Sequence, residues 1–419
     1  MQLNKKKRVY DLIALASCSL IGATGAVSVS AANETSKDDW KIDTALLYYS
    51  EQDRVTAVEP VIGVTKTFAN DKVFTGKLTV DTLTGASHNG AAVSDQAQTF
   101  TTPSGNSTYT VAPGDVPLDD TFLDTRVALN AQMKQPLGRL STITYGANFS
   151  TEYDYRSIGI NAGYARDFNQ RNTTLALGLS LTQDAMDPEG GAPVLYSLME
   201  NEEKEGTDTR TIVDALLGIT QVIDRNTIMQ FNYGIGSSSG YHNDPFKVVT
   251  IVDEVNGDLA YMYESRPDSR VKHSFYWRTK HHFEKDMIDF SLRLMTDDWG
   301  VTSETLDVRY RWSLSEDSYL EPHIRYYTQS AADFYVEKIN SGSSTAEQVS
   351  ASYKAQGEDF SADYRLGGLD STTVGLKWGT RMAGNQELSA RVELYQQSGD
   401  TEAADLDALI TQIGYTFYF

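Results

Sequence analysis

Apolar and polar residues alternate along most of this chain. In the segment 306–314, Val308 and Tyr310 share one face, whereas Asp307 and Arg309 share the other. The same pattern recurs in segments 175–182 and 288–294. Because successive side chains of a β-strand point to opposite faces, this two-residue period predicts strands with one apolar and one polar face. Each segment has about the length of a strand that crosses a bilayer at a tilt.

About sixteen such segments can be placed. They lie near Trp40, Val58, Phe74, Val127, Ile143, Ile158, Leu175, Val213, Met229, Phe275, Ile288, Val308, Ile324, Val374, Leu388 and Ile413. Short links alternate with long ones, which lie around Gly90, Glu200, Asn256 and Ser343. An even strand number with short periplasmic turns and long external loops is typical of bacterial outer-membrane barrels. The pattern therefore predicts an all-β fold, a transmembrane antiparallel β-barrel over residues 33–419.

Both ends of the chain indicate export to the bacterial outer membrane. Residues 1–32 have the order of a signal peptide: a basic stretch, an apolar stretch and small residues before the cleavage point. In an alternative interpretation, Cys18 is the lipidated first residue of a lipoprotein. At the other end, Ile413, Tyr415, Phe417 and Phe419 share one face, which matches the terminal strand signal of outer-membrane barrels.

Composition narrows the possible partners. The mean hydropathy is -0.39, and no apolar run is long enough to cross a bilayer as a helix. The formal net charge of -21 argues against nucleic acid as a partner and leaves outer-membrane lipids as the expected surroundings. The acidic loops around 115–124 and 200–208 are expected to be solvated, or to meet divalent cations at the level of the lipopolysaccharide.

Basic side chains gather on the predicted luminal face of neighbouring strands. They are Lys272, Arg278, Lys280, Arg293, Arg309 and Arg311, opposed by Asp289 and Asp307. Such a ladder can stabilise a water-filled interior, or it can hold an anionic phosphate or flavin. No metal site is predicted, because His281 and His282 alternate on one strand and point to opposite faces.

A heptapeptide at the end of the third predicted strand is the strongest candidate for chemistry. The sequence Asp81-Thr82-Leu83-Thr84-Gly85-Ala86-Ser87 resembles the acceptor motif of proteins modified by the periplasmic flavin transferase, which moves FMN from FAD onto a hydroxyl. By this resemblance Ser87 is the acceptor and carries FMN through a phosphoester, and Asp81, Thr84, Gly85 and Ala86 are recognition residues. The alternative is an ordinary turn, because Thr-Gly-Ala-Ser is also common turn chemistry.

A wider resemblance covers nearly all of the chain after the signal peptide. The heptapeptide, the stretch 119–126 and the terminal strand together resemble the proteobacterial family catalogued as domain of unknown function 3570. This resemblance implies extracytoplasmic redox chemistry in the company of the flavin transferase, a thioredoxin-like protein and a small lipoprotein.

Two functions follow from these observations. In the first, the barrel carries covalent FMN and takes part in electron transfer as a redox carrier rather than as a turnover enzyme. In the second, it is a porin-like channel or an export conduit for a small partner, without a cofactor. Because successive strands alternate in direction across the membrane, Ser87 is expected at the external end of its strand, away from the flavin transferase in the periplasm. Three alternatives would resolve this conflict: modification before barrel closure, a segment 84–120 that folds back into the lumen instead of forming a long loop, or an incorrect assignment of the strand directions.

Overall fold

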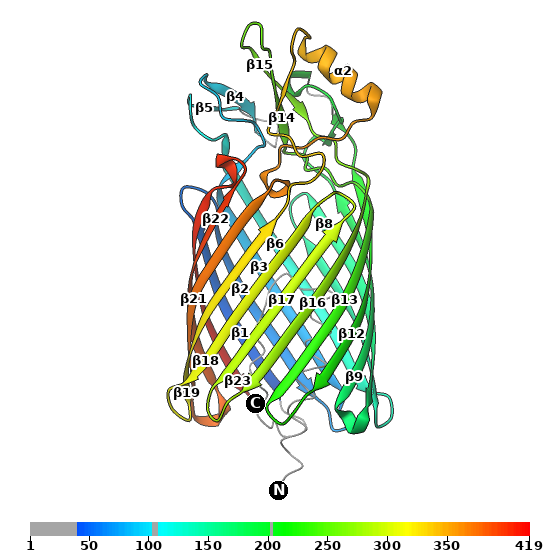
Figure 1. Ribbon diagram of the computed structural model, residues 1–419, viewed down its shortest axis with the longest axis vertical. Helices are drawn as coiled ribbons and strands as arrows, with labels where there is room; N and C mark the ends of the chain where they lie inside the picture. The colour runs from blue at the N-terminus through cyan, green and yellow to red at the C-terminus, as the bar shows by residue number, and fades with distance from the viewer. Residues whose placement is uncertain (1–39, 103–107, 202–203) are drawn as a thin grey trace.

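The computed structural model describes residues 40–102, 108–201 and 204–419, so the predicted signal peptide, residues 1–32, and Cys18 lie outside the described part. The described chain forms a closed barrel of antiparallel strands (Figure 1). In ring order its strands are β1 (Trp40–Glu51), β2 (Thr56–Thr67), β3 (Val73–His88), β6 (Leu118–Pro136), β7 (Ser141–Thr151), β8 (Tyr155–Phe168), β9 (Thr173–Met186), β12 (Asp208–Val222), β13 (Thr227–Gly240), β16 (Ser269–His282), β17 (Met287–Asp297), β18 (Thr302–Ser313), β19 (Ser318–Gln329), β21 (Leu369–Arg381), β22 (Glu387–Gly399) and β23 (Leu406–Tyr418).

The ring closes where the first strand pairs with the last. β1 and β23 run antiparallel, with Lys41 opposite Tyr418 and Glu51 opposite Ala408. Closure leaves no strand edge unpaired, which a sheet in lipid requires. Each position at which the sequence predicts a strand lies in one of the sixteen barrel strands or directly at its boundary, so the predicted fold class is confirmed.

The two ends of the barrel differ. Short links such as 68–72, 137–140 and 223–226 lie at one end, where β1 also begins and β23 finishes (Figure 1). The long segments 89–117, 187–207, 241–268 and 330–368 all lie at the other end. Short turns face the periplasm in outer-membrane barrels, so the end with the long segments is external.

The outer surface of the wall is apolar. Outward positions on successive strands, such as Ile158, Leu179 and Leu394, are 60 to 64% exposed. Aromatic side chains including Phe168, Trp312 and Trp378 are also exposed near the periplasmic end, and Phe417 stacks between Tyr415 and Phe419 there. Such a belt with an aromatic border is suited to lipid, and the protein lies in the bacterial outer membrane. No helix among the described residues is long and apolar enough to cross a membrane.

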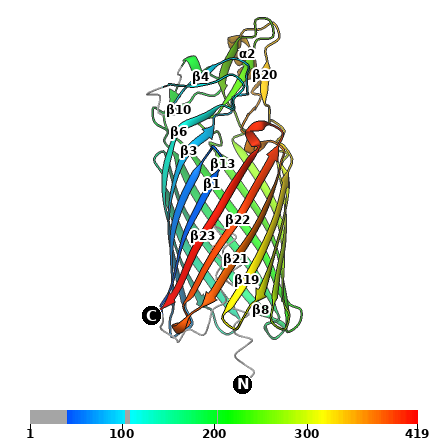
Figure 2. The same cartoon turned by 90° about the vertical axis from the view of Figure 1, so that its left-hand side faces the viewer.

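The four long segments fold together above the external rim into a structure that we call the cap. It contains the hairpin β4 (Gln98–Thr101) and β5 (Thr108–Val111), the pair β10 (Ala192–Pro193) and β11 (Lys204–Glu205), the sheet β15 (Leu259–Tyr263), β14 (Val248–Val252) and β20 (Lys338–Asn340), and the helix α2 (Ala346–Gln356) (Figures 1 and 2). The segment expected at 84–120 divides between β3, the cap hairpin and β6.

The hydrophobic core of the molecule lies in the cap. One cluster combines Leu198, Ile251, Met262, Ile339 and Phe360 from three of the long segments. A second cluster joins the remaining segment to β14 and is formed by Ala91, Phe100, Val111 and Val248. The cap is therefore a folded unit with its own interior, because apolar side chains from loops distant in sequence exclude water together.

The position of the lipid-facing belt can be tested by introducing an arginine at two different depths in the membrane. Leu179→Arg, in the middle of β9, should lower the free energy of unfolding by about 2–4 kcal/mol, because the guanidinium faces hydrocarbon. The same change at Leu140, in the periplasmic link 137–140, should cost no more than about 1 kcal/mol. Denaturant unfolding in lipid vesicles measures both values. Equal losses at the two positions would contradict the placement of the belt.

Candidate functional site

The predicted acceptor heptapeptide lies wholly within β3, at the external end that strand parity predicts. Ser87 stands opposite Asp119 of β6 and is partly buried. The Ser87 hydroxyl makes no hydrogen bond to any other described residue. Thr84 is exposed, and Ala86 is partly buried. The hydroxyl that the motif marks as acceptor is therefore chemically free, and its residue pairs with β6 alone, because the pairing of β3 with β2 ends at Thr84.

Gly85 is required by the wall itself. Its φ is +124°, and a Cβ at this position would lie 2.2 Å from the carbonyl oxygen of Arg54. The pairing of β3 with β6 shifts between Gly85 and Ser87, which is a β-bulge or irregularity of the kind common at barrel rims. Only glycine tolerates this backbone angle together with so close an approach. The structure thus accounts for this glycine without a cofactor.

Asp81 takes part in an ion pair on the luminal face. Arg126 of β6 donates from Nε to Asp81 Oδ2 over 2.6 Å, and Glu152 lies 4.0 Å from the same guanidinium. Asp81 is 5% exposed, and its second oxygen has no hydrogen-bond partner among the described residues. The carboxylate is therefore committed to the wall of the lumen.

The predicted luminal ladder is present. Arg278 and Lys280 of β16 both contact Asp289 of β17, at 2.5 and 3.0 Å. Arg309 lies 3.2 Å from Asp307 on the same strand. Charge-assisted hydrogen bonds of this kind hold ionised side chains in a fixed arrangement on the wall.

The ladder extends further around the ring than the sequence analysis recognised. Arg311 contacts Glu321 of β19 at 2.8 Å. His323, also on β19, bridges two carboxylates, with Nε2 2.9 Å from Asp307 and Nδ1 2.7 Å from Glu393 of β22. Asp307, His323 and Glu393 therefore connect three strands, β18, β19 and β22, in one ionic network on the luminal face.

A family model described as "Protein of unknown function (DUF3570)" matches residues 10–413. The chain belongs to this family. The resemblance seen in the sequence is thereby confirmed, and the family description assigns no activity. No curated protein matches the sequence.

Solved structures with similar shape are outer-membrane barrels. A bacterial polysaccharide outer membrane secretin has 10% identity and a TM-score of 0.44, with 92% of this chain and 100% of that chain covered. The outer membrane protein OpdK from Pseudomonas aeruginosa has 9% identity and a TM-score of 0.39, with coverages of 91% and 99%. CdiB from Acinetobacter baumannii has 8% identity and a TM-score of 0.48, with coverages of 91% and 60%. These similarities concern the barrel architecture only.

In this DUF3570 barrel, a buried ionic cluster holds two of the cap segments together. Arg266 lies 2.6 Å from Glu264 and 3.0 Å from Asp363, which come from different segments. Arg365 contacts Asp363 at 2.6 Å and Asp244 at 2.8 Å. The carboxylates of Glu264 and Asp363 are almost fully buried. Buried charges are tolerated only when paired in this way.

The cluster changes the acidity of its members. Burial alone would raise the pKa of Asp363, but Arg365 and Lys247 outweigh it and hold that pKa well below its usual range. Burial raises the pKa of Glu264, against the opposing effect of Arg266. Lys247 also donates to the carbonyl oxygen of His88, the last residue of β3. The cap is thus fastened to the wall one residue beyond Ser87.

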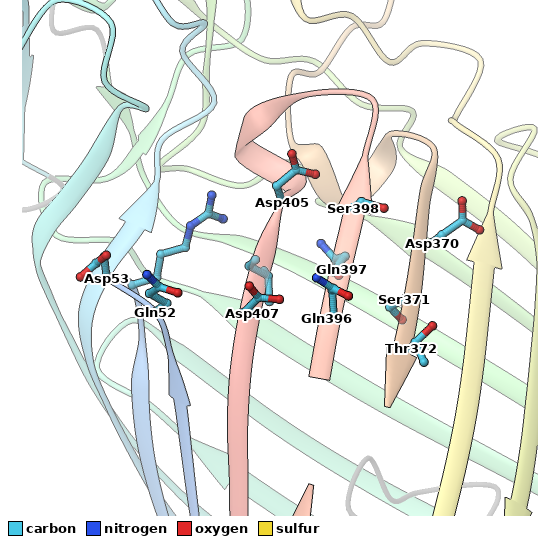
Figure 3. A pocket seen from close by; sticks show the side chains of 12 residues that line it. Gln52, Asp53, Asp370, Ser371, Thr372, Gln396, Gln397, Ser398, Asp405 and Asp407 are labelled. Atoms are coloured by element: carbon cyan, nitrogen blue, oxygen red, sulfur yellow. The ribbon is translucent and has the colours of Figure 1, made fainter. Parts of the chain in front are cut away.

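A separate cavity of about 680 Å³ lies at the external ends of β21, β22 and β23 (Figure 3). Its exposed lining side chains include Asp370, Thr372, Gln396, Ser398 and Asp407. Asp370 and Thr372 alternate in register with lipid-facing Val374 on β21. These side chains therefore lie on the outer wall, at the upper border of the belt, and not in the lumen.

The cap was not predicted from the sequence, although two local signals in the chain indicate it. The run Val248 to Val252 is apolar except for Thr250 and consists entirely of β-branched residues, which is typical of a strand buried on both faces. The segment 345–357 begins with Thr345 and Gln348 in a capping box and finishes at Gly357 in the left-handed region, which are helix boundaries. Both signals lie within segments that the two-residue period assigned to loops.

The ionic cluster predicts how the cap responds to pH. Because the pKa of Asp363 is depressed, its stabilising contribution is complete above the unfolded value of about 3.9 and is lost only as pH falls through the folded value. The contribution of Asp363 to the protection of the cap should therefore be equal at pH 7 and pH 5, whereas the raised pKa of Glu264 adds a separate pH dependence. Asp363→Asn should weaken the protection of the cap against proteolysis at both pH values, by about 3–5 kcal/mol.

Limited proteolysis of segment 241–268 in the intact barrel measures this protection. Glu254→Gln, an exposed carboxylate in the same segment, is the matched control and should behave as wild type. If Asp363→Asn left the cleavage rate unchanged, the cluster would not hold the cap.

Proposed function

We propose that this protein is a porin-like conduit, through which small hydrophilic solutes cross the outer membrane. One observation carries the proposal: the luminal face is polar on strands around the whole ring. Buried polar residues on this face include Thr79, Thr144, Ser180, Thr220, Asn232, Glu321 and Glu393. Water-compatible side chains of this kind line the channel of porins.

The arrangement of the remaining structure supports an aqueous passage. Apart from the one-turn 3-10 helices of two periplasmic links, η1 (Asn169–Arg171) and η4 (Ala383–Asn385), every described helix and strand outside the ring lies above the external rim (Figures 1 and 2). A ring of sixteen strands is wide enough to leave an aqueous channel between its side chains. Small residues also line the lumen, and at Gly163 a Cβ would fit without a clash, in ordinary contact with its nearest atom at 3.6 Å.

The conduit is tested by ion conductance in planar bilayers. The purified barrel should give discrete conductance steps, and Gly163→Trp should lower the step size because the indole projects into the lumen. Ala162→Trp, on the lipid side of the same strand, should leave the step unchanged. A folded, inserted barrel that gives no conductance would overturn the proposal.

A second candidate function is favoured by the free hydroxyl of Ser87. In it, the oxygen of Ser87 attacks the diphosphate of FAD, a phosphoester to FMN forms, and AMP leaves. The attached flavin would then serve extracytoplasmic electron transfer. Because Ser87 is paired in the wall at the external end, the flavin transferase must act before the barrel closes.

Mass spectrometry tests flavin attachment independently of conductance. Protein from cells with active flavin transferase should carry an FMN-sized mass increase on the peptide containing Ser87, and Ser87→Ala should abolish it. Ser94→Ala, in the cap segment that follows, is the control and should retain the increase. An unmodified Ser87 peptide from such cells would rule this candidate out.

A further inference from the structure

Charge is distributed unevenly around the lumen. On β16 to β22, cationic side chains on the luminal face outnumber carboxylates. The cations are Arg270, Lys272, Arg278, Lys280, Arg293, Arg309, Arg311, Arg325, Lys377, Arg381 and Arg391, and the carboxylates are Asp289, Asp297, Asp307, Glu321, Glu387 and Glu393. This half of the wall is therefore positive, although the whole chain carries a net charge of -21.

Ion pairing does not cancel the excess, because the carboxylates are already occupied. Asp289 is shared by two cations, and Glu393 contacts both Arg391 and His323. Among the described residues, no carboxylate lies within 4.0 Å of the charged groups of Lys272, Arg293, Arg325 or Lys377.

The cations without a partner are accessible from the lumen. Arg293 and Arg325 are exposed at luminal positions, whereas the carboxylates of Glu321 and Glu393 are buried beneath their neighbours. Arg293 lies with its guanidinium 5.8 Å from the centre of the Tyr276 ring. On this half of the wall, a mobile ion therefore meets guanidinium groups before it meets the carboxylates of Glu321 and Glu393.

These cations follow one another along the barrel axis. Lys272 is near the external end of β16, and Arg293 pairs in register with Tyr276, closer to the middle. Arg325 pairs with Asp307 and Thr373, and Lys377 with Arg391 nearer the periplasmic end. The positive charges are thus distributed along the barrel axis through the membrane and do not form one local patch.

The facing wall is neutral and has small side chains over its centre; its carboxylates Asp167 and Asp184 lie toward the strand ends, where each contacts an arginine. β7, β8 and β9 lie half a ring away from β19, β21 and β22. Their central luminal residues are Thr144, Gly146, Asn148, Ser157, Gly159, Asn161, Gly163, Ala176, Gly178 and Ser180. Two of the glycines are packed against neighbouring side-chain amides: a Cβ would lie 2.5 Å from Asn148 Oδ1 at Gly159 and 3.2 Å from the Asn161 amide at Gly146. This wall cannot offset the cations opposite it.

We infer that the lumen selects anions, with Arg293 and Arg325 as the residues that determine the selectivity. The inference rests on the proposed conduit and names its substrate class: small inorganic and organic anions such as chloride, phosphate and carboxylates. Rings or rows of arginine and lysine lower the energy of an anion in a pore and raise that of a cation. Low-dielectric walls strengthen this field inside the lumen, so the local charge outweighs the net charge of the chain.

The reversal potential across a planar bilayer under a KCl gradient tests the inference. Wild-type protein should pass chloride in preference to potassium. Arg293→Gln and Arg325→Gln should each lower the chloride-to-potassium permeability ratio by roughly two- to five-fold, as removal of one unit charge near the ion path predicts. Arg325→Lys keeps the charge and should keep the wild-type ratio.

The control variant is Arg225→Gln, an exposed cation in the periplasmic link 223–226, which should leave the ratio unchanged. Wild-type conductance that favours potassium, or arginine variants that conduct with the wild-type ratio, would overturn the anion inference alone. Absence of conductance in the folded wild-type protein would instead remove the conduit on which it rests. Using two separate arginine variants keeps the test decisive if one of them fails to fold.

Discussion

Lipid offers no hydrogen-bond partners to the backbone, and this constraint shapes the whole molecule. Sixteen strands satisfy their amides only by closing on themselves, which they do where β1 meets β23. Once the backbone is fixed in this way, each side chain must face either lipid or lumen. The alternation of Leu175, Leu177 and Leu179 with Ala176 and Gly178 is a direct result, because lipid accepts only the apolar set.

Closure of the barrel also determines where charged side chains can lie and where the hydrophobic core can form. The lumen is enclosed by the wall, so ionised side chains pair across neighbouring strands, as Arg278 does with Asp289. The core sits instead in the cap, where Ile251, Met262 and Phe360 exclude water between loops. A soluble barrel of smaller diameter would fill its interior with apolar side chains. Here the interior remains polar and is available for ions.

The sequence predicts the wall well because lipid and lumen impose the same period on every strand. Segments near Trp40, Leu175 and Ile413 all proved to be strands. The ion-pair partners Glu321, His323 and Glu393 could not be predicted, since which residues meet depends on the register between strands distant in sequence. Parallel pairing of β14 with β20 in the cap is equally non-local, because Ile251 and Ile339 lie far apart along the chain.

The cap and the wall are mechanically one unit. β14 is covered on both faces, with Val248 in the cluster that holds the hairpin β4–β5 and Val249 in the cluster that includes α2. Its first residue donates to the carbonyl oxygen of Asn89, and Lys247 donates to that of His88, so β14 continues directly from the rim of β3. A loop that shares a core with three others cannot swing out by itself without exposing that core. In the proposed conduit, the cap would therefore limit the size of the solutes that reach Arg293, and the choice between anions and cations would depend on the wall.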